Sequence, residues 1–135
     1  MSYTVAIYSL VVCLRSAVHY HFLSPVCSLP LLIFTPSSFS IRTSEVIYIP
    51  VKTLDNSHVI HINRNLYVTD LVRTVCDCVD YKCSEELIYD VIGHYMRKYD
   101  TNLLLEYAST RGMKDSIYML LGTYDKYATE LLENM

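Results

Sequence analysis

The stretch from Cys83 to Met135 carries apolar side chains at helical spacing almost throughout, and this pattern constrains the fold more than any other feature of the chain. Residues three and four positions apart share one face of a helix, so each run predicts an amphipathic helix. Short helices of this kind bury their apolar faces only by packing on one another and on preceding residues. The three runs are Leu87, Ile88, Val91, Ile92, Tyr95, Met96 and Tyr99; Leu103, Leu104, Tyr107 and Ala108; and Ile117, Leu120, Leu121, Tyr124, Ala128 and Leu131.

Local signals set the ends of these helices. Ser84, followed by two glutamates, is a typical helix start. The Asp100–Asn102 segment separates the first helix from the second. Arg111 and Gly112 are expected to end the second helix, because glycine tolerates the left-handed closing conformation.

Upstream, Glu45 to Lys52 and His58 to Ile62 are rich in β-branched residues and predict two short strands. Pro50 cannot donate to a strand ladder, which favours an edge position for the first strand. The intervening Leu54–Ser57 segment has turn chemistry, so we expect a β-hairpin. Asn65 is expected to cap a further helix over 66–79. The predicted fold class is therefore α+β, a short β-hairpin followed by a cluster of four to five α-helices.

Residues 1–42 form an apolar extension that differs in composition from the rest. Thr4 to Leu14 has the length of a signal peptide but lacks a preceding basic residue, and polar residues and Pro25 interrupt it as a membrane span. Three interpretations stay open: a weak signal or anchor, an extra helix or strand packed on the domain, or a variable extension without a defined fold. We expect a domain boundary near 41–43 and an interaction domain over 43–135.

The composition and the chemistry-bearing residues argue against several function classes. The net charge is −3, with 11 Lys and Arg against 14 Asp and Glu, so no basic face for nucleic acid is expected. The odd count of five cysteines favours reduced thiols. Cys76, Cys78, Cys83 and His94 have poor spacing for zinc. We expect no catalytic residues, metal, cofactor or small-molecule substrate, and hence no enzyme.

Three segments resemble the BTB/POZ fold as the Skp-type ubiquitin-ligase adaptors use it. Val51 to Ile62 is similar to the opening hairpin of that family. Val72 to Cys76 is similar to the Ile-Lys-Thr-Met-Leu run of its first long helix. LLLEYASTRGMKDSIYMLL, residues 103–121, resembles the Leu-rich helix, the buried alanine and the corner that opens the next helix. Within that segment the matching positions are Ala108, Met113 and Lys114. The resemblance covers roughly residues 46–128.

The resemblance implies a protein–protein adaptor with a cullin on one face and a substrate receptor on another. Thr110 and Arg111 stand where the family places an Asn-Tyr pair, the acidic insertion is missing, and the sequence ends before the F-box-binding helices, so we expect a divergent copy. Exposed tyrosines on the last helix favour a partner or self-association. The expected partner-binding residues are Thr110, Arg111, Met113, Lys114, Tyr118 and Tyr127.

Two alternatives remain beside the adaptor. One is a helical-repeat module of the ankyrin kind, which lacks support from internal self-similarity. The other is a small secreted or membrane-anchored protein, which rests on residues 1–42 alone. The adaptor implies the cytoplasm or nucleus, and a functional signal in residues 1–42 implies the secretory pathway and membrane contact.

Overall fold

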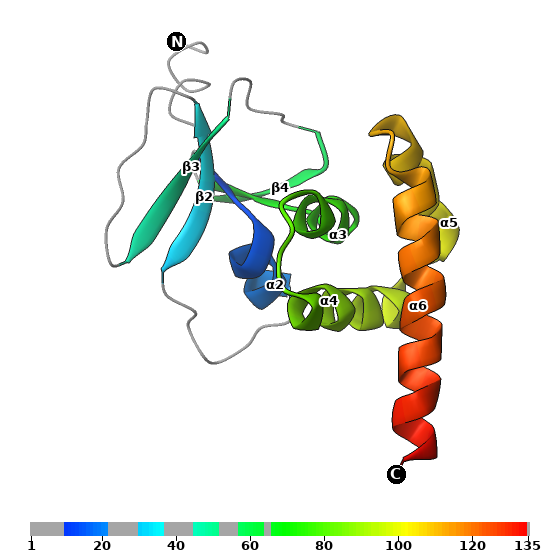
Figure 1. The fold of residues 1–135 in the computed structure, drawn as a ribbon. Coiled ribbons are helices and arrows are strands. Elements are labelled where there is room, and N and C mark those ends of the chain that lie inside the picture. The colour runs from blue at the N-terminus through cyan, green and yellow to red at the C-terminus, as the bar shows by residue number, and fades with distance from the viewer. Residues whose placement is uncertain (1–9, 22–29, 37–44, 52–56, 64–65, 135) are drawn as a thin grey trace. The chain divides into compact units, whose positions relative to one another are not determined.

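The computed structural model describes residues 10–21, 30–36, 45–51, 57–63 and 66–134 (Figure 1). The chain divides into two compact units, which are described separately: a sheet unit, residues 1–77, and a helical unit, residues 78–135. The predicted α+β class is confirmed at this level, because the described residues form a mixed sheet and five helices. None of the helices within the described ranges is long and apolar enough to cross a membrane.

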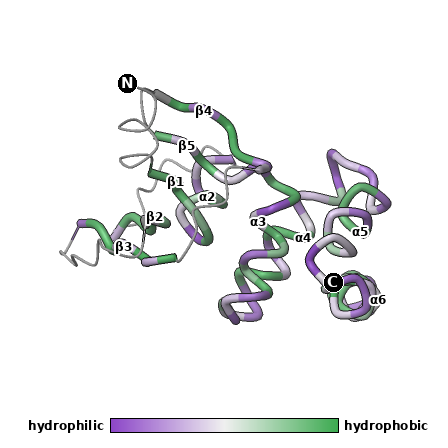
Figure 2. Tube along the Cα trace, turned by 90° about the horizontal axis from the view of Figure 1, so that it is seen from above, coloured by the Kyte–Doolittle hydropathy of each residue, from purple (hydrophilic) through white to green (hydrophobic). Residues whose placement is uncertain are grey.

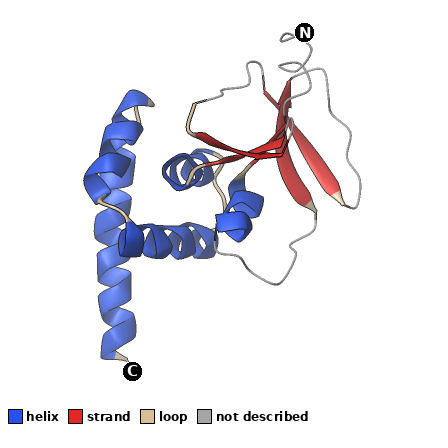
Figure 3. Ribbon diagram, turned by 180° about the vertical axis from the view of Figure 1, so that it is seen from behind, coloured by secondary structure: helices blue, strands red, loops and turns tan. Residues whose placement is uncertain are grey.

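The sheet unit is built on five strands in the order β3-β2-β1-β5-β4. Figure 3 shows the strands in red and the helices in blue. β1 lies at the centre, antiparallel to β2 and parallel to β5. β2 runs parallel to β3, and β4 runs antiparallel to β5. The strands are β1 (Leu10–Val12), β2 (Leu31–Pro36), β3 (Val46–Val51), β4 (Val59–Asn63) and β5 (Leu66–Thr69).

Helix α2 (Leu14–His21) follows β1 and packs against the sheet. Its Ala17 joins Val12, Ile33 and Val68 in the buried core of the unit. The Ser16 hydroxyl accepts a hydrogen bond from the Leu32 backbone N–H at 2.8 Å, which ties the helix to β2. At its other end a His21 ring nitrogen lies 2.7 Å from the carbonyl oxygen of Thr69, the last residue of β5. The segment between β1 and β2 is thus anchored to strands on both sides of β1.

The predicted β-hairpin is wrong. The strands expected to pair, β3 and β4, lie at opposite edges of the sheet. Their β-branched residues do form strands, but β3 takes its partner from β2 and β4 from β5. The turn residues 54–56 and the expected boundary at 41–43 lie outside the described residues, and β2 and β3, on either side of that boundary, are neighbours in one sheet.

The helix expected over 66–79 is replaced by two elements. Residues 66–69 form strand β5, and helix α3 (Leu71–Asp80) begins only after Asp70. Val68 pairs with Val12 of β1 and is fully buried, so the gain from sheet pairing and burial overrides the local helical spacing. Asn65, the expected cap, lies outside the described residues.

The helical unit confirms the three helices predicted after Cys83. They are α4 (Glu85–Lys98), α5 (Thr101–Thr110) and α6 (Lys114–Glu133). The Ser84 hydroxyl accepts from the Leu87 N–H at 3.2 Å, and the Asp100 carboxylate accepts from the Asn102 N–H at 2.9 Å, as N-caps do. The buried side chains of this unit include Val91, Ile92, Tyr95, Leu104 and Ile117, so each predicted apolar stripe contributes to its core.

Candidate functional site

The corner between α5 and α6 is a helix-ending Schellman motif. Gly112 has a φ of 69°, the left-handed conformation expected of it. The Met113 N–H donates to the Ala108 carbonyl at 2.8 Å, and the Gly112 N–H donates to the Ser109 carbonyl at 3.1 Å. These two bonds satisfy the last carbonyls of α5 and fix the direction in which α6 starts. Ala108 is fully buried beneath the corner, as the sequence pattern predicted.

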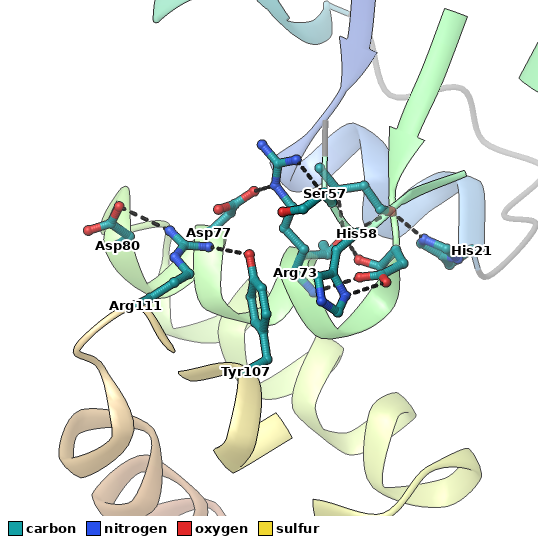
Figure 4. Close-up of polar contacts among 11 residues, drawn as sticks. His21, Ser57, His58, Arg73, Asp77, Asp80, Tyr107 and Arg111 are labelled. Atoms are coloured by element: carbon teal, nitrogen blue, oxygen red, sulfur yellow. Dashed lines mark hydrogen bonds and ion pairs between the residues drawn. The ribbon is translucent and has the colours of Figure 1, made fainter. Parts of the chain in front are cut away.

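Arg111 is held inside the helical unit (Figure 4). Its guanidinium donates to the Tyr107 hydroxyl and to the Asp80 carboxylate, each at 3.3 Å. The guanidinium carbon also lies 5.7 Å from the centre of the Tyr107 ring, a cation–π distance. Arg111 is half-buried and already engaged, so its main role in this geometry is to brace the corner.

The other expected contact residues differ in exposure. Thr110, Lys114, Tyr118 and Tyr127 are exposed, whereas Met113 is half-buried. The Thr110 hydroxyl donates to the Tyr107 carbonyl at 2.6 Å. Tyr118 is 67% exposed on the first turns of α6 and is the most accessible tyrosine described. The structure therefore gathers Thr110, Lys114 and Tyr118 around one corner and places Tyr127 farther along α6.

An open hollow of ≈ 450 Å³ lies beside the corner. Its lining combines one face of α5, at successive helical turns, with the first residue of α6. Polar and charged groups surround a single leucine, so the hollow offers hydrogen bonds together with one apolar contact. The lining residues are Asn102, Leu105, Glu106, Ser109 and Lys114.

The apolar stripe of α6 changes from buried to exposed along the helix. Ile117 and Leu121, in the first half, are buried at 0% and 8% exposure. Leu131, on the same stripe two turns beyond Tyr124, is 50% exposed, and its neighbour Leu132 is 73% exposed. Figure 2 colours the tube by the hydropathy of each residue, with hydrophobic residues in green. The last turns of α6 therefore present apolar side chains that the helical unit does not cover.

Three tyrosines lie at the transition between the two halves of α6. Tyr89 of α4 stacks on Tyr127 with ring centres 4.8 Å apart, and Tyr124 lies 6.0 Å from Tyr89. A Cβ atom on Gly93 would lie 2.7 Å from the Tyr124 hydroxyl oxygen, so glycine makes room for this ring. Partial desolvation and the Glu85 carboxylate raise the pKa of Tyr89. We call Tyr89, Tyr124 and Tyr127 the tyrosine cluster.

A second polar group, at the start of α3, was missed by the sequence reasoning (Figure 4). Asp70 accepts from the Arg73 N–H at 2.9 Å and lies 2.9 Å from Nδ1 of His58. Arg73 donates to the Asp77 carboxylate at 3.2 Å and to the Ser57 carbonyl at 2.9 Å. The Arg73 and Asp77 side chains are both nearly buried. Their spacing of four residues, which places opposite charges on one face of α3, is the signal that would have found them.

The contacts of this second group hold elements of the sheet unit together. The Asp70 carboxylate caps α3, and Arg73 links α3 to the backbone before β4, with its guanidinium carbon 5.8 Å from the centre of the Phe34 ring in β2. The Thr69 and Thr74 hydroxyls are 2.7 Å apart and buried. The group joins three parts of the sheet unit through satisfied hydrogen bonds.

Cysteine and histidine chemistry adds no further site among the described residues. Cys13, Cys76 and Cys78 are buried, and Cys83 is half-buried. Within the same ranges no cluster of three or more His, Cys, Asp or Glu side chains has an arrangement that could hold a metal ion. The chain matches no protein-family model and no curated protein sequence.

Proposed function

We propose that this protein is a non-catalytic adaptor of the Skp type, with a BTB/POZ-like domain that links a cullin to a substrate receptor in ubiquitin-dependent degradation. Its place of action is then the cytoplasm or nucleus. The proposal extends the resemblance of residues 46–128. The observation that carries it is the set of exposed side chains on α6, which lie beyond what the helical unit needs for its own core.

The α5–α6 corner supports a partner contact. Its backbone is fixed by the Schellman bonds and braced by Arg111, so the exposed side chains around it are presented at low entropic cost. Lys114 and Tyr118 combine a cation with an exposed aromatic ring, and aromatic residues are enriched in interfaces. The adjoining hollow gives a partner side chain a place to enter. We assign this corner to the cullin.

The distal half of α6 supports the second contact. Tyr127 and Leu131 are exposed one turn apart on α6, and the adjacent Leu132 is exposed as well. An amphipathic helix presents such a stripe when another element packs on it. We assign this half to the substrate receptor. The two contacts then lie on opposite halves of one helix, which keeps them at a fixed separation.

The test is a calorimetric titration of the full chain with the N-terminal domain of a cullin. The expected result is a dissociation constant of about 1 µM or tighter, corresponding to roughly −8 kcal/mol. The double variant Lys114→Glu, Tyr118→Ala is expected to weaken binding at least about tenfold, since aromatic contacts dominate interface energies. Arg111 is left intact because its substitution would disturb the corner itself.

Lys126→Glu is the matched control, because it reverses a charge at another exposed position of the same helix. We expect it to bind the cullin as the unmodified chain does. No heat from a sample whose circular dichroism shows the folded chain would reject the cullin assignment. Equal loss with Lys126→Glu would show a general charge effect in place of a contact at the corner.

The helical-repeat alternative is less well supported. A helical-repeat module stacks pairs of helices and contains no sheet. Here the described residues form one five-stranded sheet, in which β1 pairs with β5 from a distant part of the chain. The secretory alternative rests on residues 1–42, of which residues 10–21 and 30–36 are described and contain β1, α2 and β2 of the sheet unit.

A further inference from the structure

The outer strands of the sheet, β3 and β4, differ at their open edges. An open edge carries backbone N–H and C=O groups that can pair with an added strand, and natural sheets commonly protect such edges. β3 contains Pro50, which cannot donate a backbone hydrogen bond. β4, from Val59 to Ile62, contains no proline and no Asp, Glu, Lys or Arg. Of the two edges, β4 is therefore the better suited to accept another strand.

The pairing of β4 with β5 defines which backbone groups face outward. The His58 carbonyl accepts from the Asp70 N–H at 2.9 Å, and Ile60 is the Cα partner of Val68. Hydrogen-bonded pairs alternate along an antiparallel ladder, so Ile60 directs its backbone groups to β5. Val59, between them, directs its N–H and C=O away from β5, toward the open edge.

A row of apolar side chains crosses the whole sheet and ends at this edge. The strand registers place Tyr48, Ile33, Val12, Val68 and Ile60 side by side in that order. Ile33, Val12 and Val68 belong to the buried core and are at most 5% exposed. Ile60 continues the row but is 41% exposed, because no described strand lies beyond it. The row therefore ends at the edge of the sheet with an exposed apolar side chain, Ile60.

We propose that β4 pairs antiparallel with β4 of a second copy of this chain, about a two-fold axis at Ile60. In that register the Ile60 side chains of the two copies lie directly opposite one another and extend the apolar row from one sheet into the next. β-branched residues paired across strands are favourable. No like charges of Asp, Glu, Lys or Arg meet, because Val59 to Ile62 contains none of these residues. A second copy fits better than an unrelated peptide because the edge matches itself.

The inference is independent of the adaptor function. Its test is sedimentation equilibrium of the full chain over a range of about 10 to 500 µM. The unmodified chain is expected to form a dimer in this range. Ile60→Lys places a charge at the two-fold axis, a device by which natural edge strands avoid pairing. It is expected to weaken the dimer at least about tenfold, and Ile60→Val is expected to retain it.

Leu132→Lys is the matched control, since Leu132 is another exposed apolar residue, in the helical unit. It is expected to leave the dimer intact. A chain that stays monomeric at the highest concentration overturns the proposal, and so does a dimer that survives Ile60→Lys. Loss of the dimer with Leu132→Lys alone would place the interface on α6 and overturn it as well.

Hydrogen exchange of the unmodified chain keeps the test decisive if Ile60→Lys does not fold. The Val59 amide faces the open edge and is expected to exchange more slowly as the dimer forms. Amides in the last turns of α6 serve as the internal reference and are expected to exchange at a constant rate. Protection that is independent of concentration at Val59 contradicts pairing through β4.

Discussion

The sheet unit and the helical unit are held together by different kinds of contact. In the sheet unit, the central strand β1 pairs with β5, whose residues lie far along the chain. In the helical unit, α5 and α6 are joined by a corner of a few residues, and each helix has its own start and stop signals. The sheet unit therefore depends on long-range pairing, whereas the helical unit is assembled from neighbours in sequence.

The interiors of the two units differ as well. The buried polar and charged residues of the described chain all lie in the sheet unit: Ser16, Thr35, Thr69, Arg73, Thr74 and Asp77. The buried side chains of the helical unit are aliphatic or small, apart from Tyr95 and Tyr107. A buried polar network is favourable only while each member keeps its partners. We therefore expect the sheet unit to be more sensitive to loss of a single partner than the helical unit.

Arg73→Met gives the largest expected effect and tests that sensitivity. It removes the guanidinium that Asp77 and the Ser57 carbonyl face, and leaves a carboxylate in a nearly buried position. Breaking one side of a buried ion pair costs about 3–5 kcal/mol in the free energy of unfolding. Urea denaturation measures the loss. The double variant Arg73→Met, Asp77→Leu should recover much of it, and a single variant as stable as the unmodified chain would contradict the role of the pair.

A pair of core truncations compares the units directly. Ile33 and Leu104 are almost fully buried, in the sheet unit and the helical unit respectively. Ile33→Ala and Leu104→Ala should each cost about 2–5 kcal/mol, because each leaves a cavity. Hydrogen exchange should show the larger loss of protection in the unit that carries the substitution. Equal loss in both units after either change would mean that they unfold as one cooperative body.

Gly93 in α4 and Gly122 in α6 allow a test of packing within the helical unit, with smaller expected changes in stability. Gly122 has open space where a Cβ would lie, so Gly122→Ala should stabilise α6 by about 1 kcal/mol through helix propensity. At Gly93 the same gain is opposed by overlap with the Tyr124 hydroxyl, and overpacking costs about 1–3 kcal/mol. Thermal unfolding should therefore rank Gly122→Ala above the unmodified chain and Gly93→Ala below Gly122→Ala. The reverse order would exclude the close approach of Tyr124.

Tyr95→Phe has the smallest expected effect. The Tyr95 hydroxyl donates to the Asp100 carbonyl at 2.8 Å and the side chain is fully buried. Deleting this hydroxyl should cost about 0.5–1.5 kcal/mol. Tyr118→Phe is the control, since Tyr118 is exposed and should change the free energy of unfolding by less than about 0.5 kcal/mol. Equal effects at both positions would show that the Tyr95 bond adds nothing.

Sequence patterns predicted the helical unit well because its signals are local. Ser84, the periodic apolar residues and Gly112 each act within a few residues, and the helices begin and end near them. In the sheet unit, the same kind of reasoning identified β-branched strands but paired them wrongly. The apolar spacing around Val68 also fits a helix, and the strand there is set by pairing with Val12, which is distant in the sequence.

The candidate site was predictable in the same uneven way. The exposure of Tyr118 and Tyr127 follows from their offset from the apolar stripe and is confirmed. The engagement of Arg111 could not be foreseen, since Asp80 lies 31 positions away and no local pattern links the two. Like the pairing of β1 with β5, this ion pair joins residues that are distant in the sequence.

The central position of β1 has a consequence for biosynthesis. β1 cannot meet its parallel partner until β5 has been translated, and Leu10 pairs with Leu66. At about 5–20 residues per second, this interval lasts roughly 3–11 s. During that time both edges of an incomplete sheet are available to other chains. A nascent chain of this protein is therefore expected to need chaperone protection early, before the helical unit has been made.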